Sequence, residues 1–245
     1  MKIKSALVTQ MSGSIGGMTG SHNQSGLYLR ARSIPVNPNT TRQIIVRSAL
    51  TQLITRWTET LTPAQRAGWD TYATNVPVTN PLGDPIKISG QNWYVAANTS
   101  RLQINAVLTP ATPLLLVDDA PVIFDRGDFE TPVIASVGVA AGYSVTFNNT
   151  DAWANEDDSA MIVYQALPVN PSRNFFKGPF RAVDVIPGDA ITPPTSPFVI
   201  TNVLIGIADA FPLVVGQSTR LDVLVVRADG RVSTRRMIGP ETVGA

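Results

Sequence analysis

The spacing of apolar residues changes near residue 107, and this change restricts the fold more than any other feature of the sequence. Before it, apolar residues recur at steps of four, three and four, which is typical of one face of an amphipathic helix. After it, short β-rich runs alternate with Gly- and Pro-containing turns, and no helix-period segment lies between them. Strands at this spacing predict an antiparallel β-sandwich of about seven strands. We therefore expect an α+β chain. The helical stripe comprises Val46, Leu50, Leu53 and Trp57, with Ile54 beside them.

The positions of the turn-forming residues proline and glycine support this division of the chain. The sequence has 19 prolines and 18 glycines, and many of them separate short apolar runs, as expected for strands and turns. The Pro-rich stretch 192–197 is predicted to be a loop. The expected strands cover residues 133–139, 143–147, 160–167, 180–186, 198–203, 204–207 and 221–227.

The region before residue 107 predicts three short helices. Thr40 or Thr41 can cap the first helix, and Thr62-Pro63-Ala64-Gln65 is a capping-box start for the second. The third is expected to begin at Ser89. Each helix carries a tryptophan, and together these could form one core in a module of only about 70 residues. The expected core residues are Trp57, Trp69 and Trp93.

The first 33 residues predict an extended arm or hairpin that contains a glycine-rich piece. Residues 26–32 alternate like a strand, so Arg30 and Arg32 would share one face. The arm has too few apolar residues for its own core, and we expect it to order against the rest of the chain or a neighbour. Three parts follow: an arm or hairpin over 1–36, a three-helix docking module over 37–106 and a β-sandwich over 107–245.

The charge of the chain is unevenly distributed. Residues 1–110 hold ten Lys or Arg and three acids, a net charge of +7, whereas residues 111–245 hold nine bases and fifteen acids, a net charge of −6. A basic half joined to an acidic half suggests two different neighbours or head-to-tail contacts between copies. We expect polar docking contacts with an acidic protein surface. The residues predicted to make them are Arg30, Arg32, Arg42 and Arg47.

The sequence offers no recognisable catalytic set. It contains no cysteine and one histidine, His22, which excludes disulfides, thiolate chemistry, two-His metal sites and most triads. The glycine segment 13–20 lacks the Lys-Ser/Thr ending of a phosphate loop. We therefore predict no catalytic, cofactor-binding or metal-binding residues. We also find no convincing signal peptide and no apolar run long enough for a membrane span.

Two acidic clusters and one tripeptide leave alternatives open. The acids could in principle bind calcium or form a glycosidase pair, but neither cluster has EF-hand spacing, and we interpret them as solvated loops. Arg126-Gly127-Asp128 matches the integrin-binding tripeptide, and we interpret it as a turn. The bases of the first half are dispersed and form no nucleic-acid signature, so we do not expect direct nucleic-acid binding. The acids are Asp118, Asp119, Asp125, Asp128 and Glu130, followed by Glu156, Asp157 and Asp158.

The order of several short segments between Gly16 and Leu102 resembles an N-terminal module of tailed-bacteriophage structural proteins. The segments are Gly16-Gly17, Arg30 and Arg32, Pro35-Val36-Asn37-Pro38-Asn39-Thr40, Leu61-Thr62-Pro63-Ala64-Gln65-Arg66, and Ser89-Gly90 with Trp93 and Asn98. The stretch 225–233 looks like the last strands of a fibronectin type III or immunoglobulin-like domain. The resemblance implies a virion component, assembled in the bacterial host cytoplasm, with no catalytic residues.

The resemblance does not say which part of the virion, and our leading interpretation is a non-enzymatic capsid decoration or cement protein that docks through its basic N-terminal half. Its partners would be the major capsid protein or other virion proteins, with the copies forming a homo-oligomer or a lattice, and with no membrane contact. One alternative is a tail, neck or baseplate protein or a fibre anchor. Another is a carbohydrate-binding module that uses Trp153 or Phe175-Phe176, which would require exposed aromatic rings.

Overall fold

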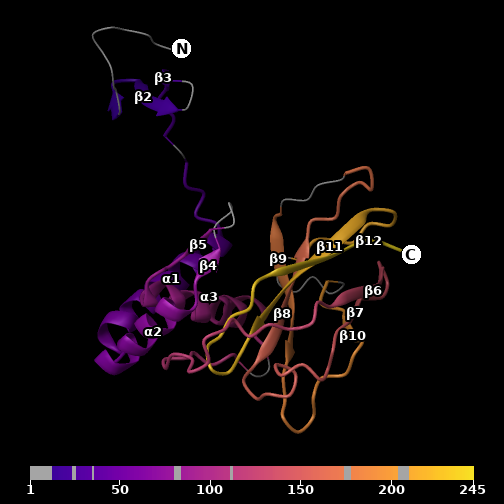
Figure 1. Ribbon diagram of the computed structural model, residues 1–245. Coiled ribbons are helices and arrows are strands. Elements are labelled where there is room, and N and C mark those ends of the chain that lie inside the picture. The colour runs from indigo at the N-terminus through magenta and orange to yellow at the C-terminus, as the bar shows by residue number, and fades with distance from the viewer. Residues whose placement is uncertain are drawn as a thin grey trace. The chain divides into compact units, whose positions relative to one another are not determined.

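The computed structural model has an α+β fold with three helices and several antiparallel sheets (Figure 1). It describes residues 13–23, 26–34, 36–79, 84–110, 113–173, 178–203 and 210–245. The expected strand at 204–207 lies outside these residues. The chain divides into two compact units, Met1–Thr41 and Arg42–Ala245.

The N-terminal unit contains a three-stranded antiparallel sheet. Its strands lie in the order β1-β2-β3, and the turns are so short that each strand pairs with the next one along the chain. The predicted hairpin therefore forms, with one additional short strand. The strands are β1 (Gly13–Ile15), β2 (Met18–Asn23) and β3 (Gly26–Ala31).

Three helices follow the N-terminal sheet, and each begins at or directly after a residue predicted to cap it. The N–H of Gln65 donates to Thr62 Oγ1 (3.3 Å) and Gln65 Oε1 accepts from the N–H of Thr62 (2.9 Å), which completes the capping box. Ser89 caps the third helix by accepting from the N–H of Asn92 (3.3 Å). A two-stranded antiparallel ribbon, with two residues in each strand, separates the last two helices. The elements are α1 (Thr41–Glu59), α2 (Pro63–Asn75), β4 (Val78–Thr79), β5 (Pro85–Ile86) and α3 (Gly90–Leu108).

Seven further strands within the described residues form two antiparallel sheets. The strand order is β10-β7-β6 in the smaller sheet and β12-β11-β8-β9 in the larger one. The strands are β6 (Val133–Gly138), β7 (Gly142–Thr146), β8 (Ala160–Ala166), β9 (Phe180–Pro187), β10 (Phe198–Ile200), β11 (Ser218–Val226) and β12 (Arg236–Thr242).

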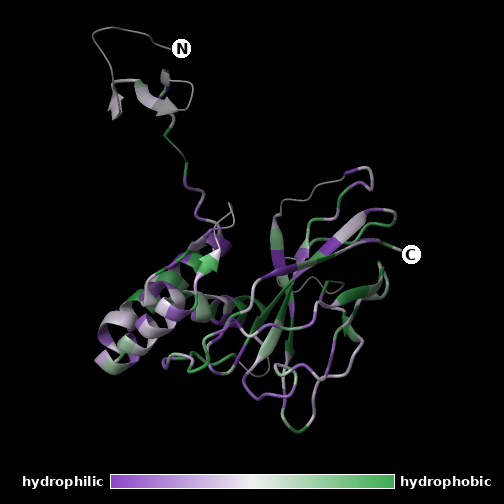
Figure 2. Ribbon diagram, viewed as in Figure 1, coloured by the Kyte–Doolittle hydropathy of each residue, from purple (hydrophilic) through white to green (hydrophobic). Residues whose placement is uncertain are grey.

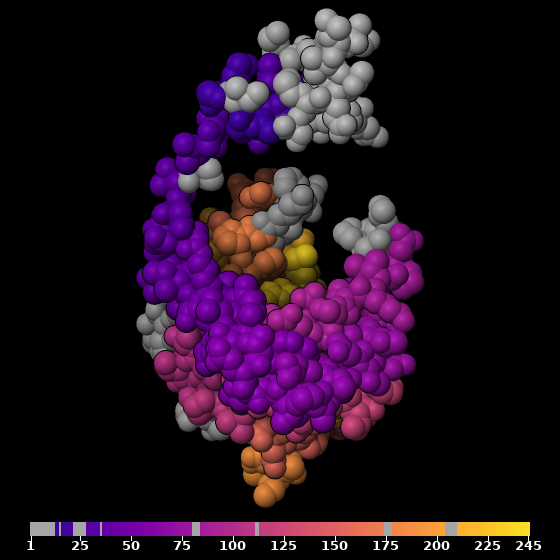
Figure 3. Space-filling model, turned by 90° about the vertical axis from the view of Figure 1, so that its left-hand side faces the viewer, coloured from indigo at the N-terminus to yellow at the C-terminus, as the bar shows by residue number. Residues whose placement is uncertain are grey.

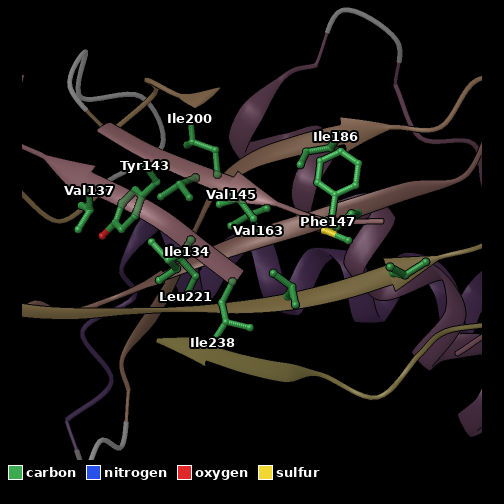
Figure 4. Close-up of a cluster of buried hydrophobic side chains, with 14 of the residues drawn as sticks. Ile134, Val137, Tyr143, Val145, Phe147, Val163, Ile186, Ile200, Leu221 and Ile238 are labelled. Carbon is green, nitrogen blue, oxygen red and sulfur yellow. The ribbon is translucent and has the colours of Figure 1, made fainter. Parts of the chain in front are cut away.

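Side chains of both sheets meet in one core. Ile134 and Val145 of the smaller sheet and Val163, Leu221 and Ile238 of the larger sheet belong to the same buried cluster (Figure 4). A short polar chain crosses this core. Tyr143 Oη lies 2.7 Å from Thr219 Oγ1, and Gln165 Nε2 donates to Tyr143 Oη (3.1 Å). Because a buried polar group needs its partner, these bonds favour one alignment of the two sheets.

The other face of the four-stranded sheet packs against the helices. Trp69 and Tyr94 of the helices share a buried cluster with Ile162 of β8 and Leu224 of β11. All seven residues of β8 are buried, since both faces of this strand are covered. The boundary expected between residues 106 and 107 thus lies inside the compact unit Arg42–Ala245. Three short helices do not enclose their own indole rings, and the sheet supplies the missing apolar surface.

The buried side of α1 differs from the predicted stripe. Leu53 is fully buried, but Val46 and Leu50 are 41% and 43% exposed, and Ala49 takes the buried position in their place. Figure 2 shows hydrophilic and hydrophobic residues alternating around the helices. In Figure 3 the viewer looks onto the helical layer, where α1 and α2 form much of the surface.

Candidate interaction sites

The N-terminal sheet has two chemically different faces. Strand alternation and the pairing of Thr19 with Arg30 and of Ser21 with Tyr28 place these four side chains on one polar face. Pairing continues past β3, because the N–H of Arg32 donates to the carbonyl of Gly17 (2.8 Å). Arg30 and Arg32 are both exposed. The opposite face carries Met18, Gly20, Leu29 and Ala31.

The N-terminal unit contains no acidic residue, whereas the second unit has a small negative net charge. Residues 1–41 contain four bases and no acid, a net charge of +4. Residues 42–245 contain fifteen bases and eighteen acids, a net charge of −3. The N-terminal unit has no carboxylate side chain with which its cations could form an ion pair. Its positive charge can therefore attract negatively charged groups outside the unit.

The two predicted docking arginines on α1 differ from those of the N-terminal sheet. Arg42 Nη2 donates to the carbonyl of Phe180 at the start of β9 (3.1 Å), so this guanidinium joins α1 to the edge of the larger sheet. Arg42 therefore has a contact within its own unit, which differs from its predicted role as a docking residue. Arg47 is exposed on α1. Of the four predicted docking residues, Arg30 and Arg32 are the pair that lies in the acid-free unit.

The three predicted core tryptophans lie in or against one cluster. Trp69 is fully buried and its Nε1 donates to the carbonyl of Asp118 (2.9 Å). Trp93 is 2% exposed and meets Tyr72 edge to face, with ring centroids 5.2 Å apart. Trp57 is partly buried and packs on Tyr94 (5.6 Å). Trp69 and Trp93 thus belong to the buried cluster that the helices share with the larger sheet, and Trp57 packs against it.

A polar stripe on α3 holds the segment that follows this helix. Asn98 Oδ1 accepts from the N–H of Val117 (2.8 Å) and its Nδ2 donates to the same residue's carbonyl (2.9 Å). Asn105 pairs with Leu114 in the same way, at 2.9 and 2.8 Å. Between them, the fully buried Arg101 donates to backbone carbonyls of three separate segments. We did not predict this stripe, although its spacing of three and four residues was visible in the sequence.

Four of the eight clustered acids, Asp118, Asp125, Asp128 and Glu156, pair with arginines. Arg56 forms a bidentate pair with Asp118 at 2.8 and 2.6 Å, and this guanidinium lowers the pKa of the carboxyl. Arg231 pairs with Asp125 (2.6 Å), and Arg227 pairs with Glu156. Among the described residues, no group of three or more His, Asp or Glu side chains could hold a metal ion. The calcium alternative gains no support from this part of the chain.

The Arg-Gly-Asp tripeptide is tied into the fold. Arg126 Nε donates to the carbonyl of Val232 (3.2 Å) and Nη2 to that of Ser233 (3.3 Å). Its guanidinium also lies over the Trp93 ring, 5.3 Å from the centroid. Gly127 has φ +62°, as a turn requires. The arginine thus makes contacts within the chain, which agrees with our interpretation as a turn.

The aromatic residue expected for glycan binding is buried. Trp153 is 1% exposed and packs against Phe147, with ring centroids 5.4 Å apart. Sugar binding by stacking requires an exposed ring, so Trp153 cannot serve the carbohydrate-binding alternative. The other proposed residues, Phe175 and Phe176, lie outside the described residues, as does the side chain of His22.

One carboxylate differs from the paired acids. Asp184 of β9 lines a pocket of about 280 Å³ whose other lining residues are Leu108, Pro110, Leu114, Val185, Pro187 and Asn202. Asp184 Oδ1 accepts from the N–H of Val185 (2.8 Å), but among the described residues it forms no ion pair. Burial raises its pKa from 3.8 to about 6.

This carboxylate predicts a pH-dependent stability. Since its pKa is higher in the folded protein than in the unfolded chain, its contribution favours folding below about pH 4 and is lost as the pH rises to 6. Asp184→Asn keeps an acceptor for Val185 and should raise the free energy of unfolding at pH 7 by on the order of 2 kcal/mol, after allowance for partial exposure. Urea unfolding at pH 4 and pH 7 tests this. An equal difference at both pH values would contradict it.

Comparisons of the chain with protein-family models, curated proteins and solved structures found no match. Within the described ranges, none of the three helices has the length and apolar character of a membrane span.

Proposed function

We propose that this chain is a non-enzymatic structural protein of a tailed-phage virion, a capsid decoration or cement protein that docks through its N-terminal unit. The observation that carries the proposal is the sheet of residues 13–31, which presents Arg30, is followed directly by the exposed Arg32 and belongs to the separate, acid-free unit Met1–Thr41. The proposal that the chain belongs to a virion rests on its sequence resemblance to tailed-phage structural proteins. The partner would be the major capsid protein or another virion protein, and the copies would be held in an oligomer or lattice.

The arrangement of the C-terminal strands supports an immunoglobulin or fibronectin III-like sandwich. If the strands from β6 to β12 are lettered A, B, C, C′, E, F and G, the smaller sheet is A-B-E and the larger sheet is C′-C-F-G. Sandwiches of this kind divide their strands between two sheets in this manner. Such a domain serves many roles, so the fold alone does not assign one.

The proposed docking depends on charge and on stabilisation of the three-stranded N-terminal sheet by its partner. A three-stranded sheet with one apolar face gains stability when that face is covered. Its arginines would meet carboxylates on the particle, and the guanidinium geometry suits such pairing. Association would therefore weaken as the salt concentration rises, because screening reduces contacts between exposed charges.

The alternative is a tail, neck or baseplate protein or a fibre anchor. It uses the same docking element on a different part of the virion. The buried position of Trp153 makes the carbohydrate-binding alternative weaker than either virion location.

Reversal of charge on the N-terminal sheet tests the proposal. The double variant Arg30→Glu, Arg32→Glu should bind purified particles at least about tenfold more weakly in co-sedimentation, because two cationic contacts become repulsive. Deletion of residues 1–36 should abolish binding. The matched control is Arg66→Glu, Lys87→Glu, which changes the net charge equally outside the N-terminal unit. Full binding by both the charge-reversed and the truncated protein would refute the proposal.

A further inference from the structure

The pocket around Asp184 has the chemistry of a receptor for one cationic side chain. Its walls are mainly aliphatic, and the carboxylate of Asp184 is its one charged lining group. Among the described residues no guanidinium or ammonium group offsets this charge. An arginine fits such a site, since its methylene stem packs on apolar walls while its planar head pairs with a carboxylate.

We propose that the Asp184 pocket of one copy receives an arginine from the N-terminal sheet of a second copy, so that copies associate head to tail. This inference rests on the proposed function, in which the N-terminal unit is the docking element. Arg30 and Arg32 are exposed, and their unit contains no acidic residue, whereas the second unit, Arg42–Ala245, has a net charge of −3. The two surfaces are therefore complementary in charge.

The lack of an ion pair favours Asp184 over the paired acids Asp118, Asp125 and Glu156 as the partner of a new cation. Asp118, Asp125 and Glu156 already pair with arginines of their own unit, so a new cation would have to compete. Asp184 is instead held in an apolar setting that penalises its charged form, and the attraction of an entering arginine would offset part of that penalty. A partner also gains more from a partly desolvated carboxylate than from an exposed one, where water and salt screen the pair.

The proposed contact joins two different surfaces, the pocket of one copy and the N-terminal sheet of another. A mixture of two variants, each altered in one of these surfaces, can therefore test it. A heterologous contact can continue from copy to copy, whereas an isologous one closes at two. A copy that lacks the pocket charge still presents its arginines, and a copy with reversed arginines still presents its pocket. The two variants should therefore associate with each other even though neither associates with itself.

The experiment is sedimentation velocity on the full-length chain over a concentration series at low salt. We expect the unaltered protein to associate, and both Asp184→Asn and the double variant Arg30→Glu, Arg32→Glu to associate at least tenfold more weakly. An equimolar mixture of the two variants should form a 1:1 heterodimer. Glu241→Gln, which removes one exposed charge from β12, is the control and should behave like the unaltered protein.

Thermal unfolding separates the loss of a contact from damage to the fold. Asp184→Asn should unfold at a temperature no lower than the unaltered protein at pH 7, since it removes an unpaired, partly buried charge. The proposal is overturned if the unaltered protein stays monomeric, if Asp184→Asn associates normally, or if the mixture stays monomeric. Normal association of Asp184→Asn together with loss of particle binding by the arginine variant would overturn this inference alone. Normal particle binding by the arginine variant would instead count against the proposed function.

Discussion

Replacement of Trp69 by alanine should lower the midpoint of one cooperative unfolding transition that includes both sheets. Trp69 is fully buried, donates a hydrogen bond to the carbonyl of Asp118 and meets Tyr72 and Tyr94 edge to face. Loss of a buried aromatic side chain costs about 3–5 kcal/mol. For a unit of the size of Arg42–Ala245, the midpoint temperature of thermal unfolding should fall by roughly 10 °C.

The cooperativity of this transition is the informative readout. Trp69 shares its cluster with Ile162 and Leu224 of the larger sheet, so we expect strand amides to exchange faster when the helical layer is weakened. Far-ultraviolet circular dichroism and hydrogen exchange on β8 and β11 measure this. Val122→Ala, at a site 86% exposed, is the control and should change stability by less than about 0.5 kcal/mol. Two separate transitions, with the strands unaffected, would show that helices and sheets fold independently.

Replacement of Arg101 by leucine is expected to lower the free energy of unfolding by about 3 kcal/mol or more. Arg101 Nη1 donates to the carbonyls of Leu115 (3.0 Å) and Asp158 (3.4 Å), and Nη2 donates to that of Arg227. Removing the donor leaves three carbonyls short of a partner, at roughly 1–3 kcal/mol each when they stay buried. Removing the buried charge offsets part of this loss; the same burial lowers the pKa of Arg101 to about 10.

Urea unfolding at neutral pH measures the loss, with Arg66→Leu on α2 as the control. Arg101→Lys should recover little stability, because one ammonium group cannot reach three carbonyls in different directions. If Arg101→Leu is as stable as the unaltered protein, the three carbonyl contacts do not stabilise the fold.

The local features of the fold were predictable because they depend on neighbours in the sequence. The starts of α2 and α3 followed from Thr62, Pro63 and Ser89, whose side chains act within one turn of the helix. The packing of the helices on the sheet depends on residues far apart, and we missed it. Its signal was the apolar run Ala160–Tyr164 at the start of β8, since a strand with one solvated face would alternate.

The candidate sites were predictable only in part, for the same reason. Arg30 and Arg32 were identified from alternation and charge, and both lie in the acid-free unit. Arg42 has the same side chain but bonds to Phe180, a residue 138 positions away, which the sequence does not reveal. Asp184 looked like part of an ordinary strand, and its desolvation depends on a pocket built from three distant segments.

Cryo-electron microscopy of particles that contain this protein tests the central claim, that the N-terminal unit is the docking element. The account predicts that residues 13–32 lie against a virion protein on the head lattice, with Arg30 and Arg32 directed at carboxylates. Particles without the protein, or bound copies whose N-terminal sheet faces solvent while another surface makes the contact, would contradict it.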